Sequence, residues 1–294
     1  MGAWLSSVVG SEGDGVGGLG DLPEGCIAEV LRRLDAPDIC QLMQINRTFL
    51  DAGSSDFIWE EKLPKNYGYL VKKALEGEEK AEGLGANTEK LRAFVKKDVY
   101  ALLCRRNSFD GGNKEFWLDK STGGICMQIS SKALSITGID DRRYWNYIPI
   151  EESRFGAVAY LVQIWWLEVR GEIEFPFPEG TYSLFFRLHL GKPSKRLGRR
   201  SCITDNIHGW DLKPVRFQLS TLDGQQMQSK AYLAEPGVWS CHHVGDFLVN
   251  RSDEVTRVKF SLVQIDCTHT KGGLCVDSVL IEPKGLRQDN IYCA

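Results

Sequence analysis

Alternating hydrophobicity over the second half of the chain most strongly limits what it can fold into. From 182 to 190 every second residue is apolar, and the same period of two returns at 258–262 and 274–276. Successive strand side chains point to opposite faces, so this alternation predicts half-buried antiparallel strands. The residues expected to face the core of the clearest strand are Tyr182, Leu184, Phe186, Leu188 and Leu190.

Turn signals divide this region into many short segments. Glycine, often beside an acidic residue or proline, recurs at short intervals and favours tight turns. Many short strands at such spacing indicate a β-sandwich or jelly roll, and no parallel βαβ rhythm interrupts them. The turns are expected at Glu179–Gly180, Gly191, Asp223–Gly224, Pro236–Gly237 and Gly272–Gly273.

Residues 21–64 carry a helical period instead. Pro23 and Glu24 favour a helix start, and apolar residues then recur at spacings of three and four. Pro37 interrupts a group of short helices, and Pro64 ends the group. A unit of this size builds a small core, so its apolar residues either pack internally or form a docking face. The pattern alone leaves both alternatives open.

These patterns predict an α+β multi-domain chain. The glycine-rich start, 1–17, is expected to be disordered, and 18–64 form the helical domain. Residues 65–110 hold a polar linker, placed at 76–90, and an amphipathic helix from Leu91 to Arg106. The antiparallel β-sandwich then occupies 111–294.

Charge and hydropathy exclude some function classes. The 294 residues carry a formal net charge of −3, which gives no general attraction to nucleic acid or anionic membranes. No apolar run is long enough for a membrane helix, and no basic residue precedes Arg32, which argues against a secretory signal. Gly2 with Ser6 fits a myristoylation pattern, but one acyl chain without basic neighbours would not anchor the chain stably.

The nine cysteines are scattered and include no Cys-x-x-Cys pair. We expect free thiols in a reducing compartment and no metal or other cofactor. The alternative is a zinc site, although structural zinc ligands usually come in closely spaced pairs. Its candidate ligands are Cys241, His242, His243, Cys267, His269 and Cys275.

Two further signals favour plain structural roles. The basic run 192–200 is interpreted as a solvated loop, with a nuclear address as the alternative. No GxSxG, HExxH, Walker or GxGxxG sequence occurs, and adjacent carboxylates such as Glu151 and Glu152 do not face each other across a cleft. The sequence therefore predicts a non-catalytic protein that does not bind nucleic acid.

The helical segment resembles an F-box. Its leucine-proline-glutamate start, apolar stripe, Pro37–Asp38 break and later Asn46–Arg47 follow the F-box order over about 18–64. The resemblance implies that its apolar face binds a Skp-type adaptor, which links it to cullin and RING subunits. The predicted adaptor-binding residues are Leu22, Pro23, Ile27, Val30, Leu31, Leu34, Ile39, Leu42, Phe49 and Trp59.

The remaining chain resembles the Nictaba-type phloem lectins of plants from about Lys114 to Pro283. The resemblance rests on 133–137, 143–145, 166–171 and 271–283. It implies an N-acetylglucosamine site in which two tryptophans flank the Ser-Ile-Thr segment. Trp145 stands at the second position, but Gly138 stands at the first and cannot stack on a sugar ring. The other strand tryptophans, Trp165, Trp166, Trp210 and Trp239, are predicted to fill the core.

Together the two resemblances imply an F-box protein of the phloem-lectin A class in the nucleus and cytoplasm. Its expected function is substrate recognition for a Skp–cullin–F-box ubiquitin ligase, with a protein or glycoprotein as the target. Two alternatives remain open. One is a nucleocytoplasmic lectin, and the other is a sandwich whose loops bind a protein degron.

Overall fold

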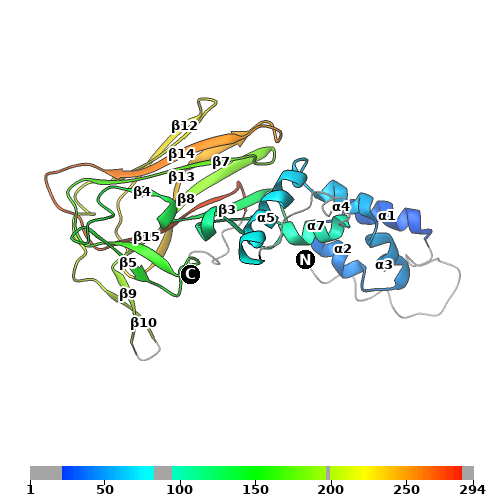
Figure 1. Ribbon diagram of the computed structural model, residues 1–294, viewed down its shortest axis with the longest axis horizontal. Coiled ribbons are helices and arrows are strands. Elements are labelled where there is room, and N and C mark those ends of the chain that lie inside the picture. The colour runs from blue at the N-terminus through cyan, green and yellow to red at the C-terminus, as the bar shows by residue number, and fades with distance from the viewer. Residues whose placement is uncertain (1–21, 83–94, 197–198, 287–294) are drawn as a thin grey trace. The chain divides into compact units, whose positions relative to one another are not determined.

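The computed structural model describes residues 22–82, 95–196 and 199–286, and the chain divides into two compact units. Unit 1 is Met1–Lys62 and unit 2 is Leu63–Ala294 (Figure 1). The expected disordered start and Gly2 lie outside the described residues. Among the helices in the described ranges, none is long and apolar enough to cross a membrane.

From residue 22 onward, where the structure describes it, unit 1 contains four short helices around a small apolar core. Pro23 directly precedes α1, and Asn46 caps α3 by accepting a 2.9 Å hydrogen bond from the Phe49 backbone N–H. The indole of Trp59 donates a 2.7 Å hydrogen bond to the Gly53 carbonyl and so ties α4 to the end of α3. The helices are α1 (Glu24–Arg32), α2 (Ala36–Leu42), α3 (Arg47–Gly53) and α4 (Asp56–Lys62).

In its described residues, unit 2 begins with the helices α5 and α7. Helix α5 (Tyr67–Glu82) overturns part of the predicted linker, because the chain remains helical through residue 82. Residues 83–94 lie outside the described part of the chain, and helix α7 covers Lys96–Leu103 within the predicted amphipathic segment. Tyr69 of α5 packs edge-on against Phe175 at 6.3 Å between ring centroids. This contact joins the helix to the strands.

Two large antiparallel sheets form the sandwich of unit 2 (Figure 1), and β9 (Lys192–Arg196) and β10 (Arg199–Ile203) form a third, two-stranded sheet. In the larger sheet, β15 pairs with β8 along one edge and with β3 and then β6 along the other, and β13 pairs with β8. Its strands are β1 (Asn107–Phe109), β2 (Lys114–Leu118), β3 (Ile125–Ser130), β5 (Trp145–Pro149), β6 (Ala157–Leu161), β8 (Gly180–Leu190), β13 (Trp239–Val249) and β15 (Leu274–Pro283).

The smaller sheet has the order β12-β11-β14-β7-β4. The two sheets pack face to face, because Phe186 of β8 contacts Phe217 of β11 and Phe260 of β14 at about 6 Å between ring centroids. The smaller sheet consists of β4 (Ser135–Ile136), β7 (Leu167–Phe175), β11 (Val215–Thr221), β12 (Gln226–Ala231) and β14 (Thr256–Gln264).

The sandwich confirms the predicted fold class and the inward face of β8. Tyr182, Leu184 and Phe186 are almost fully buried. The expectation of a half-exposed second face is wrong for this strand, since Arg187 and His189 are each 4% exposed. Strand β15 lies beside β8 and places Asp277 2.9 Å from the Arg187 guanidinium, so an internal ion pair offsets the cost of burying these charges.

Candidate functional site

The F-box-like residues of unit 1 separate into core and surface. Five predicted adaptor-binding residues are at most 2% exposed, so they lie in the core of unit 1 rather than on its surface, and their part in adaptor binding stays a prediction. Their side chains fill the small core between the four helices, because a unit of this size needs its largest apolar groups inside. They are Ile27, Leu31, Ile39, Phe49 and Trp59.

Other apolar side chains of unit 1 are exposed to a large extent. Leu22 and Val30 are about 40% exposed, and Pro23 is exposed as well, while Leu34 and Leu42 are half-buried. For these five residues adaptor binding stays a prediction. Three more residues, which sequence reasoning did not assign to the site, extend the exposed set: Ile45 (63%), Leu50 (46%) and Phe57 (46%).

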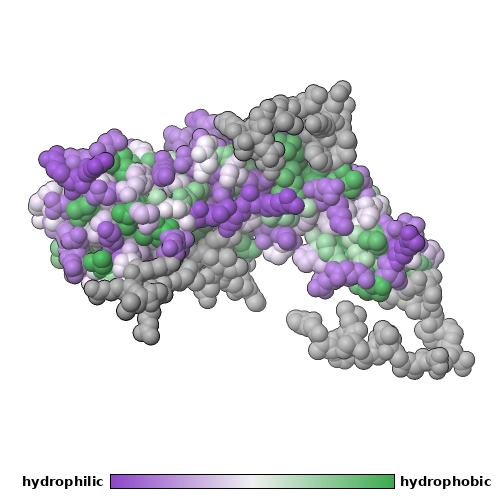
Figure 2. All heavy atoms as spheres, turned by 60° about the horizontal axis from the view of Figure 1, so that its bottom comes forward, coloured by the Kyte–Doolittle hydropathy of each residue, from purple (hydrophilic) through white to green (hydrophobic). Residues whose placement is uncertain are grey.

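We call Leu22, Val30, Ile45, Leu50 and Phe57 the apolar surface of unit 1. Figure 2 shows hydrophobic residues in green among hydrophilic residues in purple on the visible face of this unit. Leu50 follows the buried Phe49 directly, and a step of one residue turns a helix by about 100°. Leu50 therefore lies outside the row of core-facing residues, and this position in the sequence could have predicted that its side chain is exposed.

A partly exposed ion-pair cluster links α1 and α4. Arg32 of α1 contacts Glu29 at 2.9 Å and Glu61 of α4 at 2.5 Å, and Lys62 donates to the Arg32 carbonyl at 2.9 Å. The hydrogen bond from Arg32 lowers the pKa of the Glu29 carboxyl below its ordinary value. The cluster fixes α4 against α1 and thereby the positions of Val30 and Phe57 on the two helices.

The expected sugar site around Trp145 is not available in this structure. Trp145 is 1% exposed, and its indole N–H donates a 3.0 Å hydrogen bond to the Thr137 carbonyl. Gly138 adopts φ +77° in the adjoining turn, and a Cβ there would lie 3.2 Å from the Tyr144 ring. The buried indole therefore fixes this turn, and a sugar contact at Trp145 stays a prediction for which this structure presents no exposed ring face.

The four other tryptophans that the sequence assigned to the core divide evenly. Trp210 and Trp239 are buried, as predicted for core residues. The same prediction is wrong for Trp165 (53% exposed) and Trp166 (45% exposed), which stand in the bend before β7 rather than within a strand. Period-two reasoning does not apply to a bend, so their side chains were placed wrongly.

A buried lysine holds this tryptophan bend. The Nζ of Lys271, which is fully buried, donates to the carbonyls of Trp165 (2.5 Å) and Asp266 (2.6 Å). The backbones of Ile164 and Lys271 also exchange two hydrogen bonds. Burial lowers the pKa of Lys271, and the nearby Asp266 opposes that shift. The ammonium therefore joins two loops at one end of the sandwich.

The outer face of the smaller sheet is hollowed into a groove of about 900 Å³. Outward-facing side chains from all five strands line it, and most of them are amides, hydroxyls or charged groups. The sequence does not single out this face, because alternating polar residues are typical of any solvated sheet surface. We call this feature the sheet groove. Its polar lining residues are Ser135, Glu168, Arg170, Glu172, Gln218, Ser220, Gln226, Gln228, Lys259 and Ser261.

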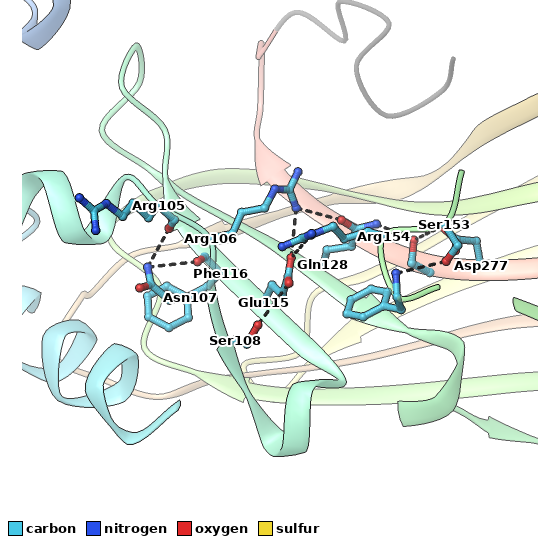
Figure 3. A network of polar contacts seen from close by, with 12 residues as sticks. Arg105, Arg106, Asn107, Ser108, Glu115, Phe116, Gln128, Ser153, Arg154 and Asp277 are labelled. Atoms are coloured by element: carbon cyan, nitrogen blue, oxygen red, sulfur yellow. Dashed lines mark hydrogen bonds and ion pairs between the residues drawn. The ribbon is translucent and has the colours of Figure 1, made fainter. Parts of the chain in front are cut away.

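A polar network around the buried Glu115 ties strands together. Glu115 of β2 contacts Arg106 at 3.4 Å and Arg154 at 3.0 Å, and Arg106 also donates to Gln128 of β3 (Figure 3). Ser153 donates a 2.5 Å hydrogen bond to Asp277 in the same view. Both carboxylates already have partners, so the network explains how unit 2 satisfies its buried charges.

The cysteines follow the predicted chemistry in part. Within the described ranges, no three histidine, cysteine or acidic side chains are grouped so that they could hold a metal ion. Free thiols are Cys26, Cys40, Cys104, Cys126, Cys202, Cys267 and Cys275. The prediction is wrong for Cys241, which is disulfide-bonded and half-buried on β13. Cys293 lies outside the described residues.

The basic run 192–200 is largely a hairpin rather than the predicted loop. Strand β9 covers Lys192–Arg196 and pairs with β10 (Arg199–Ile203), while 197–198 lie outside the described residues. Arg196 stands opposite Arg199 and Lys195 opposite Arg200 in the register of this pair. The expectation of a solvated loop is wrong for 192–196 and 199–200, because these residues pair as two antiparallel strands.

Comparison with known proteins agrees with the two-unit architecture. The F-box domain family matches residues 19–61, the range of α1 to α4, and the Phloem protein 2 family matches residues 124–283, the range of β3 to β15. The class is thus an F-box protein with a phloem-protein sandwich, as the resemblances implied. The chain belongs to the Phloem protein 2 family.

Relatives share this arrangement over nearly their whole length. F-box protein PP2-A13 of Arabidopsis thaliana is 58% identical over 265 residues, covering 90% of this chain and 88% of the relative. F-box protein PP2-A11 of the same plant is 54% identical over 271 residues, covering 92% and 90%. A family 35 carbohydrate binding module from Clostridium thermocellum gives a TM-score of 0.31 at 8% identity, covering 53% of this chain and 97% of the module. That structural likeness is too weak to carry a functional argument.

Proposed function

We propose that this protein is the substrate-recognition subunit of a Skp–cullin–F-box ubiquitin ligase. The observation that carries the proposal is the apolar surface of unit 1, which remains exposed after the F-box core has formed. Apolar anchors on a helical face are typical of protein docking, and an F-box domain implies a Skp-type adaptor as the partner.

The proposed mechanism is proximity. Unit 1 binds the adaptor, which connects it to the cullin and RING subunits, and unit 2 holds the target protein or glycoprotein. Holding a target near a charged conjugating enzyme raises its effective concentration by making the encounter intramolecular. The chain itself then needs no catalytic group, and its contribution is selection of the target.

The adaptor proposal is tested by capture of a purified Skp-type adaptor on the full-length chain. Leu50→Asp and Phe57→Asp place charges on the apolar surface without touching the buried core, and each should reduce capture at least tenfold. Leu222→Asp is the matched control, since this residue of unit 2 is 76% exposed. Equal capture by wild type and both unit 1 variants would refute the docking surface.

Carbohydrate binding by unit 2 is the second candidate function. It is supported by the sheet groove, whose lining supplies many hydrogen-bonding groups on the Phloem protein 2 domain. In this proposal the ligase target is a glycoprotein, or the protein acts as a lectin independently of the ligase. A glycan array probed with the full-length chain tests it, and retention on no glycan would remove this candidate.

We also propose that the protein acts in the nucleus and cytoplasm. Seven of the eight cysteines in the described residues are free thiols, which suits a reducing compartment, whereas the disulfide-bonded Cys241 counts against it. Microscopy of a fluorescent fusion in plant cells tests the location, and confinement to secretory compartments would contradict it.

A further inference from the structure

We propose that the sheet groove is a binding site for a neutral oligosaccharide, separate from the turn that contains Gly138 and Trp145. This inference deepens the carbohydrate-binding proposal for unit 2 and is independent of adaptor docking by unit 1. Four features of the sheet carry it: the register of its side chains, their open hydrogen-bonding capacity, their balance of charge, and the shape of the hollow.

The strand register aligns polar residues in rows across the sheet. Gln228 of β12 stands opposite Gln218 of β11, which stands opposite Ser261 of β14. Ser261 stands opposite Arg170 of β7, which stands opposite Ser135 of β4. A second row of Gln226, Ser220, Lys259 and Glu172 runs directly beside it. Amides, hydroxyls and charged groups therefore face the same hollow from five neighbouring strands.

Much of this hydrogen-bonding capacity is unused within the protein. In the part of the chain that the structure describes, the side chains of Ser135, Ser220, Gln226 and Gln228 form no hydrogen bond with another protein group. Ser261 makes a long 3.4 Å contact with Gln218. Primary amides both donate and accept, and so do hydroxyls, which is what a ligand rich in hydroxyl groups requires.

The charges of the groove cancel. Its two acidic residues, Glu168 and Glu172, are matched by Arg170 and Lys259, and Arg170 contacts Glu168 at 2.5 Å. Lys259 stands opposite Glu172 in the register of β14 and β7. A groove with this balance gives no net attraction to phosphate, sulfate or a strongly charged peptide. The balance favours a neutral ligand.

The position of the groove on the sheet favours a glycan over an extended peptide as the ligand. Peptides that bind sheets usually add to an exposed edge, where main-chain groups are unpaired, or insert apolar anchors into pockets. The sheet groove lies across the middle of the sheet, where β11, β14 and β7 are already paired with neighbours on both sides. Its volume of about 900 Å³ falls within the range of ordinary ligand sites.

The groove also accounts for two segments that carried the sequence resemblance. Strand β4 comes from 133–137 and contributes Ser135, while β7 comes from 166–171 and contributes Glu168 and Arg170. These strands pair so that Ser135 stands opposite Arg170. One wall of the groove is thus built from β4 and β7, and β4 ends just before the turn at Gly138. The buried Trp145 does not line the groove; its indole is hydrogen-bonded to the Thr137 carbonyl of that turn.

The test begins with the full-length chain on an array of neutral and acidic glycans, followed by calorimetric titration with neutral trisaccharides of glucose, mannose, galactose and N-acetylglucosamine. Wild type should bind at least one neutral series. Ser261→Trp, at the centre of the first row, should reduce affinity more than tenfold by filling the groove. Gln218→Ala removes one amide and should reduce affinity about three- to tenfold, the scale of one hydrogen bond.

Leu248→Trp is the matched control, because it adds the same ring to an exposed position on β13 outside the groove. It should bind like wild type, and Trp165→Ala should do the same. Binding of acidic glycans alone, unchanged binding by Ser261→Trp and Gln218→Ala, or selection only of peptides by the same surface would each overturn the proposal. Failure here with normal adaptor capture would leave the ligase proposal intact.

Discussion

Lys271 is fully buried, and its ammonium donates to backbone carbonyls from two loops. Replacing it with methionine keeps the approximate length of the side chain but leaves buried carbonyls without donors. We expect Lys271→Met to lower the free energy of unfolding by about 2–4 kcal/mol, measured by chemical denaturation. The exposed Lys230→Met should change it by less than about 0.5 kcal/mol. Equal effects of the two changes would contradict the role given to Lys271.

Glu282 supplies a pH dependence with a definite sign. Its pKa is raised from 4.5 to about 7, chiefly by burial and to a smaller extent by the negative charge of the nearby Asp119. The folded protein then binds this proton more tightly than the unfolded chain, so the contribution to stability is complete below pH 4.5 and is lost as pH rises through 7. The full change is about 3 kcal/mol at 1.36 kcal/mol per pKa unit.

Glu282→Gln should remove this component. The difference in unfolding free energy between wild type and Glu282→Gln should fall by up to about 3 kcal/mol between pH 5 and pH 8, measured by urea titration. Burial lowers the pKa values of His189 and His242, whose titration acts in the opposite direction but is common to both proteins. A difference that does not vary with pH would contradict the raised pKa.

At the scale of elements, the packing of β7 against β14 depends on a missing side chain. Gly171 stands opposite Phe260, and a Cβ at this glycine would lie 2.8 Å from Leu134 and closer still to the Phe260 ring. Gly171→Ala should therefore destabilise unit 2 by about 1–3 kcal/mol through overpacking.

A double-mutant cycle separates this contact from a general effect of the substitution. Phe260→Leu removes the ring, so Gly171→Ala should cost less in the Phe260→Leu background than in wild type, with a coupling above about 0.5 kcal/mol. The measurement is the unfolding free energy of all four proteins by denaturant titration. Additive effects would show that the ring does not limit the space at Gly171.

The elements also show where sequence reasoning succeeded. The alternation at 182–190 predicted β8 and its inward face because apolar residues alternate clearly there. The end of α5 was missed because 76–82 are polar and include glycine, which resembles a linker. Glutamate, lysine and alanine are nevertheless good helix formers, and α5 is also fixed by contacts such as Tyr69 with Phe175.

At the scale of the molecule, the two units should respond separately to core substitutions. Leu31 is fully buried in unit 1, so Leu31→Asp should unfold that unit by placing a charge in its core. Adaptor capture should be lost, while glycan binding by unit 2 should remain within about twofold of wild type, as checked by capture and calorimetry on the same full-length preparation. Loss of both activities would contradict separate folding of the units.

The sequence alone determined the domain organisation of the molecule: a short helical F-box unit followed by an antiparallel sandwich. These features follow from local periodicity and ordered motifs, which a single strand or helix expresses by itself. Tertiary structure alone decided which apolar residues stay outside, because burial depends on contacts between elements distant in the chain. It buried Trp145 and Leu31, exposed Trp165, Leu50 and Phe57, and brought five strands together into one polar groove.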